Sequence, residues 1–576
     1  MASRAVGVGF ARMSLWGRVE GLGVLALAAG CASSPAQPMA GDARVEDALG
    51  DRGDVAALAI RGLAQVPRVA PRCAVTDEAP LRTGDDVDAI RCTAVGASAT
   101  PGAPAWPEVA NLPDPVLYVD PAAGPDGDGT RQRPLTTIAR ALAWTPAARA
   151  VVLARGTHPV GETLRVSRDL AIVGAGALGG SVVEITRARA GIVVGAAARV
   201  SLSGLSLRFA QGAPLDADVA LASEAGALTL RDVSVDDASV ALDLAGGSLD
   251  AERITLRRSA RAGVRASGNA SVALTRFLVR DGAGQGIRAE NAHVRLTQGL
   301  VAGNGRHGVV LLGAADATGG RARCGEAGPG AIDCIDQLVS QGNGVAALYV
   351  TDARRLEVRR STLADTALTA IEGGEAGDGI FVGPDADLSL DPELISPAVR
   401  GFGSAVLGNG RGGLVAQGIR ARVAIRGAVF ARNASGGAFI GSRAQVSVIG
   451  ESIFVENRFA GIVATPGAEV GIVQCNGIAD TLAGSLRTAT ATVQLADGVH
   501  LNATGGTLAL RENAILRSGA FGLLVNAGQV ALERNRGADN RFGVGIYGGA
   551  TIMGDPSSIV GREVAPAVAP GLVPGL

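Results

Sequence analysis

The chain contains no lysine, few aromatic residues and no excess of charge of either sign. All 53 basic residues among its 576 residues are Arg, aromatic residues make up 3%, and the formal net charge is −1. Without a surplus of positive charge, nothing favours binding to nucleic acid or to an anionic membrane surface. After residue 31, no apolar run reaches the ~18 residues of a membrane-spanning helix. The 83 Gly residues instead suit many tight turns around a thin core.

The N-terminus has the pattern of an export signal. Several Arg residues precede the apolar run 21–30, which has the length of a signal-peptide hydrophobic region. The run ends in Leu-Ala-Ala-Gly-Cys at 27–31 and resembles the lipobox of bacterial lipoproteins, although Ala28 stands where that family prefers Leu. The resemblance implies cleavage before Cys31 and acylation of its thiol, and Ala32 after it implies the outer membrane. The alternative is an ordinary signal peptide with an incidental Cys.

The other five cysteines agree with export to an oxidising compartment. Cys73 and Cys92 flank one polar segment, and Cys324 and Cys334 flank another, so two local disulfides are predicted. No Cys-x-x-Cys pair occurs, which argues against zinc. Cys475 lies in a strand-like run and is interpreted as a small buried apolar residue.

Composition divides the chain into six parts. They are a signal peptide (1–30), a lipid-anchor tether (31–43), a small disulfide-bearing segment (44–95), a Pro/Ala-rich linker (96–116), a body of repeats (117–555) and a C-terminal tail (556–576).

The body repeats with a period of 21–24 residues. Units begin at Gly263, Gly286, Gly413, Gly437, Gly498 and Gly522, and each carries three short β-like stretches separated by Gly, Asn or Ala. A unit this short buries its apolar face only by stacking on its neighbours. Leucine-rich repeats share the period, but their Leu frame is absent. About sixteen stacked rungs are predicted for 117–555.

Two local patterns support stacking. Asn304, Asn409, Asn433 and Asn457 each lie four residues before the Gly of the next unit, which predicts a ladder of stacked Asn side chains. Four independent turn residues are the alternative. The segment 134–144 places Ile138, Ala141 and Leu142 on one helical face, so a short helix is expected to cap the N-terminal end of the solenoid.

The repeat pattern resembles the right-handed parallel β-helix of the pectin-lyase-like superfamily. In addition, the block from Tyr118 to Ile138, with 154–158 and 172–176, is similar to the start of an uncharacterised bacterial β-helix domain family. The predicted fold is therefore an all-β right-handed parallel β-helix. The resemblance is specific for fold and weak for function.

The resemblance also implies a test for catalysis, because those enzymes act over one strand face with Asp-bound calcium and an Arg or Lys base. The outward positions of the best-matching strand are mostly small: Ala273, Arg295, Glu357, Ser389, Ala424, Ser447, Gly471, Ala509 and Ala531. Lys is absent, and Arg rarely loses its proton. A binding or structural role is therefore favoured, and an enzyme acting on acidic polysaccharides is kept as the alternative.

Other polar groups form no recognisable site. The four His residues are scattered, and His293, His307 and His500 are expected to be solvated. A Gly-rich loop contains Asp120, Asp126 and Asp128, and a second acidic stretch contains Asp378, Asp385, Asp387, Asp391 and Glu393. Ca²⁺ could bind such oxygens, but a structural turn is favoured for the first and solvation for the second. No cofactor is expected otherwise.

One pattern predicts an interaction surface. After the repeat Gly or Ala, the first residue should point inward and the second outward. From Val310 onward these second positions are mostly apolar, and they define a predicted stripe: Val310, Tyr349, Phe381, Val415, Phe439, Val463 and Leu524. Something should cover it. Segment 44–95 is the nearest candidate, and a partner protein or a second copy is the alternative.

These observations predict an exported lipoprotein of the cell envelope, held to the outer membrane by its lipid anchor. Its β-helix would bind a glycan or a protein partner, or serve a structural role.

Overall fold

The computed structural model describes most of the chain after residue 105. The described ranges are 106–109, 111–176, 180–210, 219–313, 324, 332–352, 354–371, 374–391, 403–441, 443–487, 492–502 and 506–566, together with the backbone of 78–82 and 90–94. The chain divides into two units, Met1–Pro38 and Met39–Leu576, and the first lies outside the described residues.

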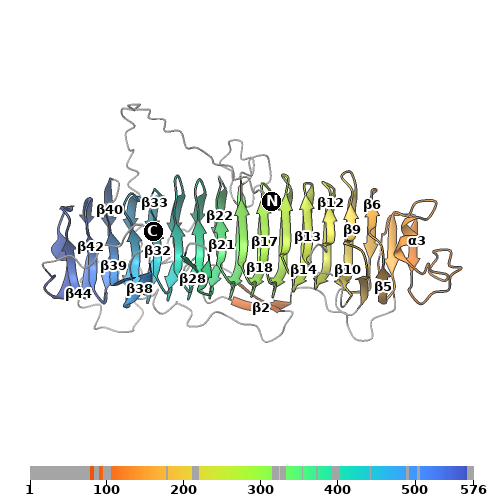
Figure 1. Cartoon of the computed structure of the whole chain (residues 1–576), viewed down its shortest axis with the longest axis horizontal. Helices are drawn as coiled ribbons and strands as arrows, with labels where there is room; N and C mark the ends of the chain where they lie inside the picture. The colour runs from red at the N-terminus through yellow and green to blue at the C-terminus, as the bar shows by residue number, and fades with distance from the viewer. Residues whose placement is uncertain are drawn as a thin grey trace, which may run out of the picture. The chain divides into compact units, whose positions relative to one another are not determined.

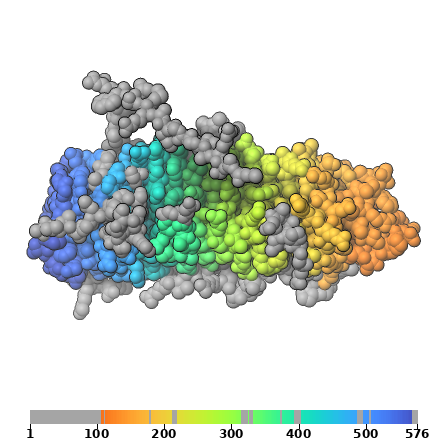
Figure 2. All heavy atoms as spheres, in the orientation of Figure 1, coloured from red at the N-terminus to blue at the C-terminus, as the bar shows by residue number. Residues whose placement is uncertain are grey.

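The second unit is a right-handed parallel β-helix, as the sequence predicts. Its strands form three columns, here called A, B and C in chain order, and within each column every strand pairs in parallel with the next rung. The rungs follow one another along the long axis in sequence order (Figures 1 and 2). Column C contains fifteen strands, one fewer than the sixteen rungs estimated from the repeat.

Six long strands each cross from column A into column B: β10 (Arg199–Phe209), β12 (Ala227–Asp236), β14 (Ser248–Arg257), β16 (Ser271–Arg280), β18 (His293–Ala302) and β20 (Asp333–Gln341). The remaining column A strands are β3 (Val116–Val119), β4 (Ala150–Leu153), β7 (Leu170–Val173), β22 (Arg355–Arg359), β27 (Asp387–Leu390), β30 (Arg422–Arg426), β33 (Gln445–Gly450), β36 (Glu469–Gln474), β40 (Thr507–Arg511), β43 (Gln529–Glu533) and β45 (Thr551–Met553). Those of column B are β5 (Gly156–Val160), β8 (Ser181–Ile185), β23 (Thr362–Ala364), β28 (Ala405–Leu407), β31 (Val429–Ala431), β34 (Ile453–Val455), β37 (Gly477–Ala479), β41 (Ala514–Leu516), the first part of β44 (Arg536–Ile546) and β46 (Ile559–Glu563).

Column C consists of β6 (Leu164–Val166), β9 (Ala190–Val194), β11 (Val219–Ser223), β13 (Val240–Ala245), β15 (Ala262–Ser267), β17 (Gln285–Glu290), β19 (His307–Leu312), β21 (Ala346–Val350), β26 (Asp378–Val382), β29 (Gly412–Ala416), β32 (Gly436–Ile440), β35 (Phe459–Ala464), β39 (Thr492–Leu501), β42 (Phe521–Val525) and the second part of β44. Three hairpins lie outside the columns: β1 (Glu78–Arg82) with β2 (Ile90–Ala94), β24 (Thr369–Ile371) with β25 (Gly374–Ala376), and β38 (Gly484–Arg487) with the start of β39.

Alternating side chains build one continuous core. In β16, Val272 and Leu274 are buried, whereas Ser271 is exposed and Ala273 is partly exposed. The same alternation recurs on each rung, so one apolar cluster runs from Leu117 in the first rung to Ile559 in the last. Branched and linear aliphatic residues suit the pleated strands that line such a core.

The corners between columns place residues other than Gly at positive φ. At the A–B corner these include Asp232 and Arg253, and at the B–C corner Asp237 and Arg258. Each Arg forms a bidentate ion pair with the Asp one rung earlier. Stacking brings these opposite charges together at a fixed spacing, which favours the paired geometry that a guanidinium offers a carboxylate.

The predicted capping helix is confirmed as α3 (Ile138–Leu142). Thr137 begins it, and its hydroxyl accepts a hydrogen bond from the Arg140 N–H at 3.2 Å. Ile138 and Ala141 are buried in the main core, and Leu142 packs against it. In the part of the chain that the structure describes, no helix is long and apolar enough to cross a membrane.

Candidate functional site

The outward side of column C differs in chemistry along its length. Leu348, Ile380 and Leu414 belong to the main core, whereas the next residue on each rung points to the opposite side. We call the surface formed by these outward side chains the column C face. It has a charged N-terminal part, an aromatic centre and an apolar C-terminal part.

The charged part is made of ion pairs. Arg265 binds Asp243 on the preceding rung through two hydrogen bonds of 2.7 and 2.5 Å. Arg288 binds Glu290 on its own strand at 2.9 Å. Arg306 is exposed and has no ion-pair partner among the described residues. Cationic groups therefore face solvent next to the aromatic centre.

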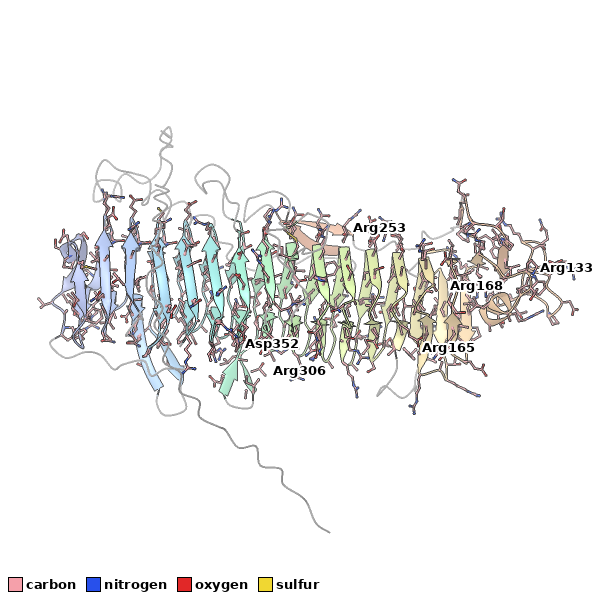
Figure 3. The ribbon with its side chains drawn as sticks, turned by 90° about the horizontal axis from the view of Figure 1, so that it is seen from above. Arg133, Arg165, Arg168, Arg253, Arg306 and Asp352 are labelled. Atoms are coloured by element: carbon pink, nitrogen blue, oxygen red, sulfur yellow. A yellow bond between two sulfur atoms is a disulfide. The ribbon has the colours of Figure 1, made fainter. Side chains whose placement is uncertain are left out.

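The aromatic centre, here called the aromatic platform, consists of His307, Tyr349 and Phe381 on three successive rungs. Tyr349 stacks on Phe381, with ring centroids 4.8 Å apart and planes inclined by 6°, and His307 meets Tyr349 edge-on at 5.2 Å. All three side chains are partly exposed. Arg306 precedes β19 and Asp352 follows β21, so these two residues lie at opposite ends of the column C strands. In the view of Figure 3 both are seen at one edge of the solenoid, and Arg253 is seen at the opposite edge.

Burial and charged neighbours act on two residues of the platform. Burial, together with the nearby Arg306 and Arg288 charges, lowers the pKa of His307 to about 4. Burial also raises the pKa of Tyr349, helped by the Asp352 carboxylate, so its phenol stays protonated and can donate a hydrogen bond. Partly exposed aromatic rings and a phenol thus lie near Arg306 and near Arg288, which is paired with Glu290.

The apolar part of the predicted stripe points away from the core but is not open to solvent. Val415, Phe439 and Val463 are at most 3% exposed. They form a cluster separate from the main core, together with Phe459, Ala460 and Leu495, and Phe381 packs against it. Leu495 comes from the β38–β39 hairpin, which therefore covers one end of this cluster. Val310 and Leu524, the two ends of the predicted stripe, are buried as well.

The described part of segment 44–95 lies elsewhere. Its strand β1 contacts β18 and β20, which belong to columns A and B. For residues 78–82 and 90–94, the expectation that this segment covers the stripe is therefore wrong. The apolar run 55–60, on which that expectation rested, lies outside the described residues.

A row of buried, hydrogen-bonded polar side chains lies on the column C face, two rungs before the last rung of the solenoid. His500 Nδ1 bonds the Asp497 carboxylate at 2.8 Å, His500 Nε2 lies 3.1 Å from Asn502 Oδ1, and the Asn526 amide donates to that oxygen at 2.9 Å. His500 is fully buried, so the expectation that it is solvated is wrong. It lies in the row of Val463 and Leu524, as the sequence predicts, and its ring is hydrogen-bonded on both sides.

The candidate catalytic strand is column A. Ala273, Arg295, Ser389, Ala424, Ala509 and Ala531 are partly exposed there, and Ser447 and Gly471 are exposed. Glu357 is 4% exposed, pairs with Arg359 and accepts a hydrogen bond from the Cys324 N–H at 3.3 Å. Arg295 and Glu357 lie in one row of column A, on the two rungs that flank Cys334, and Glu357 is already paired with Arg359.

A cavity of about 280 Å³ opens on column A near the N-terminal end. Arg149, Asp169 and Arg199 line it, and the Asp169 carboxylate accepts a hydrogen bond from the Arg199 N–H at 2.9 Å. With its one carboxylate already engaged, this cavity offers two guanidiniums and no evident acid–base pair.

The acidic stretches are held by local partners. The Asp120 carboxylate accepts from the Ala122 N–H, and Asp128 accepts from Thr130 and pairs with Arg133. Asp378 is 2% exposed and paired with Arg411. Asp391, also 2% exposed, accepts from the N–H groups of Arg360 and Ser404. Solvation of these last two residues was expected, and that expectation is wrong.

No three His, Cys, Asp or Glu side chains gather as a metal site within the described ranges. Asp126 lies in the Gly-rich loop, and Glu393 lies outside the described residues.

The predicted ladder residues lie buried at the B–C corner. The Asn409 amide donates to Asn433 Oδ1 at 2.9 Å, and Asn433 donates to Asn457 Oδ1 at 3.0 Å. Asn304 donates in the same way to Asn343, a residue that the sequence pattern did not include. A second ladder at the A–B corner joins Asn476, Asn513 and Asn535, and sequence reasoning missed it. Its signal was present, since each Asn follows a strand-like run by two residues.

Cys324 and Cys334 form a disulfide. Cys475 is buried, but it is disulfide-bonded rather than a free apolar side chain, and its partner lies outside the described residues. Cys31 and Cys73, and the side chain of Cys92, also lie outside them.

No protein-family model and no curated protein matches the chain. Among solved structures it is similar to pectate lyase Pel9A (12% identity, 65% of this chain and 77% of that one, TM-score 0.28). It is also similar to the catalytic domain of a GH87 alpha-1,3-glucanase in complex with tetrasaccharides (13%, 80% and 70%, TM-score 0.32). A third is the A-module of the Azotobacter vinelandii mannuronan C-5 epimerase AlgE4 (13%, 78% and 100%, TM-score 0.26). At these values the likeness carries no argument about function. The strand pairing defines a parallel β-helix protein. Its column C face has partly exposed aromatic side chains next to Arg side chains.

Proposed function

We propose that this chain is an exported envelope lipoprotein that binds an acidic glycan on its column C face. One observation carries the proposal: the stacked pair Tyr349 and Phe381 stays partly exposed where the charged part of the face meets the buried apolar part. The C–H face of a sugar ring packs well on an aromatic ring, and the phenol and guanidiniums can bond its oxygens.

The sign of the local charge selects an acidic sugar. Arg306 and Arg288 help burial to lower the pKa of His307, so the potential is positive at the His307 end of the platform. A carboxylated sugar residue would meet Arg306 directly and could replace Glu290 at Arg288. Arg is suited to this contact because its planar fork matches a carboxylate. The parallel rungs, ~4.8 Å apart, suit a linear polymer lying along the column.

Export and anchoring at Cys31 complete the proposal, and they rest on the N-terminal sequence. A lipid-anchored rod would hold its binding surface away from the outer membrane. Catalysis on acidic polysaccharides is the alternative function. It is not favoured, because Glu357 is buried and already paired.

A screen of the chain from residue 32 on a glycan array tests the proposal. Selective binding to uronic-acid polymers over neutral ones is expected. An assay for unsaturated uronic products should be run on the same ligands. Product release by the purified protein would favour the alternative, and Arg295 and Glu357 would then be the first residues to mutate.

A further inference from the structure

The apolar part of the column C face requires a cover. Val463, Phe459 and Ala460 lie beside Leu495 of the β38–β39 hairpin. Phe439 and Val415 lie one and two rungs farther from that hairpin, because β32 pairs with β35 and β29 pairs with β32. Their exposures of 3% and 2% are not those of outward side chains on a bare sheet, which would face water.

The end of the described chain lies at column C, beside the last rung. After the last strand, β46, the Tyr547 hydroxyl donates a hydrogen bond of 2.7 Å to the carbonyl oxygen of Pro566. Tyr547 directly follows the column C part of β44, so Pro566 lies at column C rather than at column A or B. Meanwhile Ile546, Met553 and Val560 at the last rung remain 46–55% exposed.

The residues after Pro566 have the composition of a cover. Residues 567–576 read Ala-Val-Ala-Pro-Gly-Leu-Val-Pro-Gly-Leu, with no charged or polar side chain. Two Pro residues disfavour a helix and favour an extended strand-like segment. In water alone such a segment gains nothing, whereas against an apolar groove each Leu or Val gains the transfer free energy of burial.

The segment is also long enough. From the rung of Tyr547 to that of Val415 there are five steps along column C (β44, β42, β39, β35, β32, β29), which is ~24 Å. Ten extended residues span at most roughly 33–36 Å. A strap starting at Pro566 can thus pass the β39 rung and still reach Phe439 and Val415.

We propose that residues 567–576 bind along the apolar part of the column C face as an intramolecular strap. The strap covers Phe439 and Val415. It keeps this apolar surface out of contact with other molecules.

Photocrosslinking tests where the strap lies. A photoreactive phenylalanine analogue in place of Leu572, in the chain from residue 32, should crosslink within the same chain to peptides from 412–464. The same analogue in place of Val564, which is 93% exposed, is the matched control and should not. Crosslinks between chains would show that a second copy covers the face, and crosslinks from Leu572 to any other surface would also overturn the proposal.

Removing the strap gives an independent readout. Deletion of 567–576 should raise the fluorescence of a dye that binds apolar surface several-fold, with the thermal unfolding of the β-helix retained. A second variant, Leu572→Asp with Val573→Asp, should do the same in a chain of full length. Unchanged dye binding in both variants would show that another segment, such as 39–77, is the cover.

Discussion

Tyr349 pairs with Phe381 on the next rung of column C, and their rings stack with centroids 4.8 Å apart. That separation is the spacing of parallel strands, ~4.8 Å, so the backbone pairing itself sets the stack. Phe430 and Phe454 stack identically inside the core, at 4.8 Å with planes inclined by 3°. The external pair is thus as well ordered as an internal one, and a ligand that packs on it would find a surface already in place.

The Asn ladders should contribute measurably to stability. Asn433→Ala removes the donor to the Val406 carbonyl oxygen and the partner of two neighbouring Asn side chains, all of them buried. Because buried groups left without partners are costly, the free energy of unfolding should fall by about 2–4 kcal/mol. Chemical denaturation measures it, with the exposed Arg422→Ala as control, expected to change stability by less than about 0.5 kcal/mol. Equal midpoints for the two variants would contradict a role for the ladder.

The buried ion pair of Arg354 and Asp333 should be replaceable by apolar residues. Arg354 is fully buried, at a position where other rungs have Ala386 and Ala421, and its Nη2 lies 2.9 Å from Asp333 Oδ2. Asp333→Leu alone would leave a buried guanidinium without its counter-ion and cost about 3–5 kcal/mol.

The double variant, Asp333→Leu with Arg354→Ala, should recover most of that loss, since Leu356 already occupies the Asp333 position on the next rung. Denaturation of both variants beside the wild type measures the recovery. A double variant as unstable as Asp333→Leu would show that the pair contributes more than charge compensation.

His307 should make stability depend on pH. Its pKa is about 4 in the folded protein, against an ordinary value of 6.5. Between these two values the unfolded chain binds a proton that the folded chain does not, so stability falls as the pH is lowered from 6.5 to 4. The loss should be on the order of 3 kcal/mol.

Comparing wild type and His307→Gln by denaturation at pH 4 and pH 7 isolates this loss. The variant should lose less stability on acidification than the wild type does. The same acid dependence in both proteins would contradict the burial and positive field assigned to His307.

Acylation should occur at Cys31. Cells grown with a fatty-acid probe should label the wild-type protein and not Cys31→Ser. The control Cys475→Ser changes a cysteine outside the lipobox pattern and should keep the label. Labelling that survives Cys31→Ser would remove the lipid anchor from the account.

The sequence predicted the fold because the repeat is local. A Gly every 21–24 residues, three β-like stretches and a recurring Asn specify stacking without knowledge of distant contacts. The outward position of Tyr349 and Phe381 also followed from alternation. Burial on the outside of the solenoid did not follow, because it depends on what lies over each rung. This is why His500, an outward residue by pattern, and Asp378, a member of the acidic stretch, were wrongly expected to be solvated.

Side-chain contacts between rungs of unequal length were harder to predict from the sequence than burial was. Asn343 falls outside the predicted pattern because Ala347, in place of the repeat Gly, stands four residues after it. The Arg354 and Asp333 pair, and the disulfide of Cys475, likewise join residues whose relation no short sequence window contains.

Binding of a uronic-acid polymer by platform variants tests the central claim most directly. Titration calorimetry should show at least tenfold weaker binding for Tyr349→Ala, which corresponds to about 1.4 kcal/mol, whereas Tyr349→Phe keeps the ring and should bind within a few-fold of wild type. Arg288→Ala should also weaken binding, and Arg165→Ala is its matched control. Arg165 lies far along column C and is paired with Glu224, much as Arg288 is paired with Glu290. If Tyr349→Ala and Arg288→Ala bind as the wild type does, the column C face is not the binding surface.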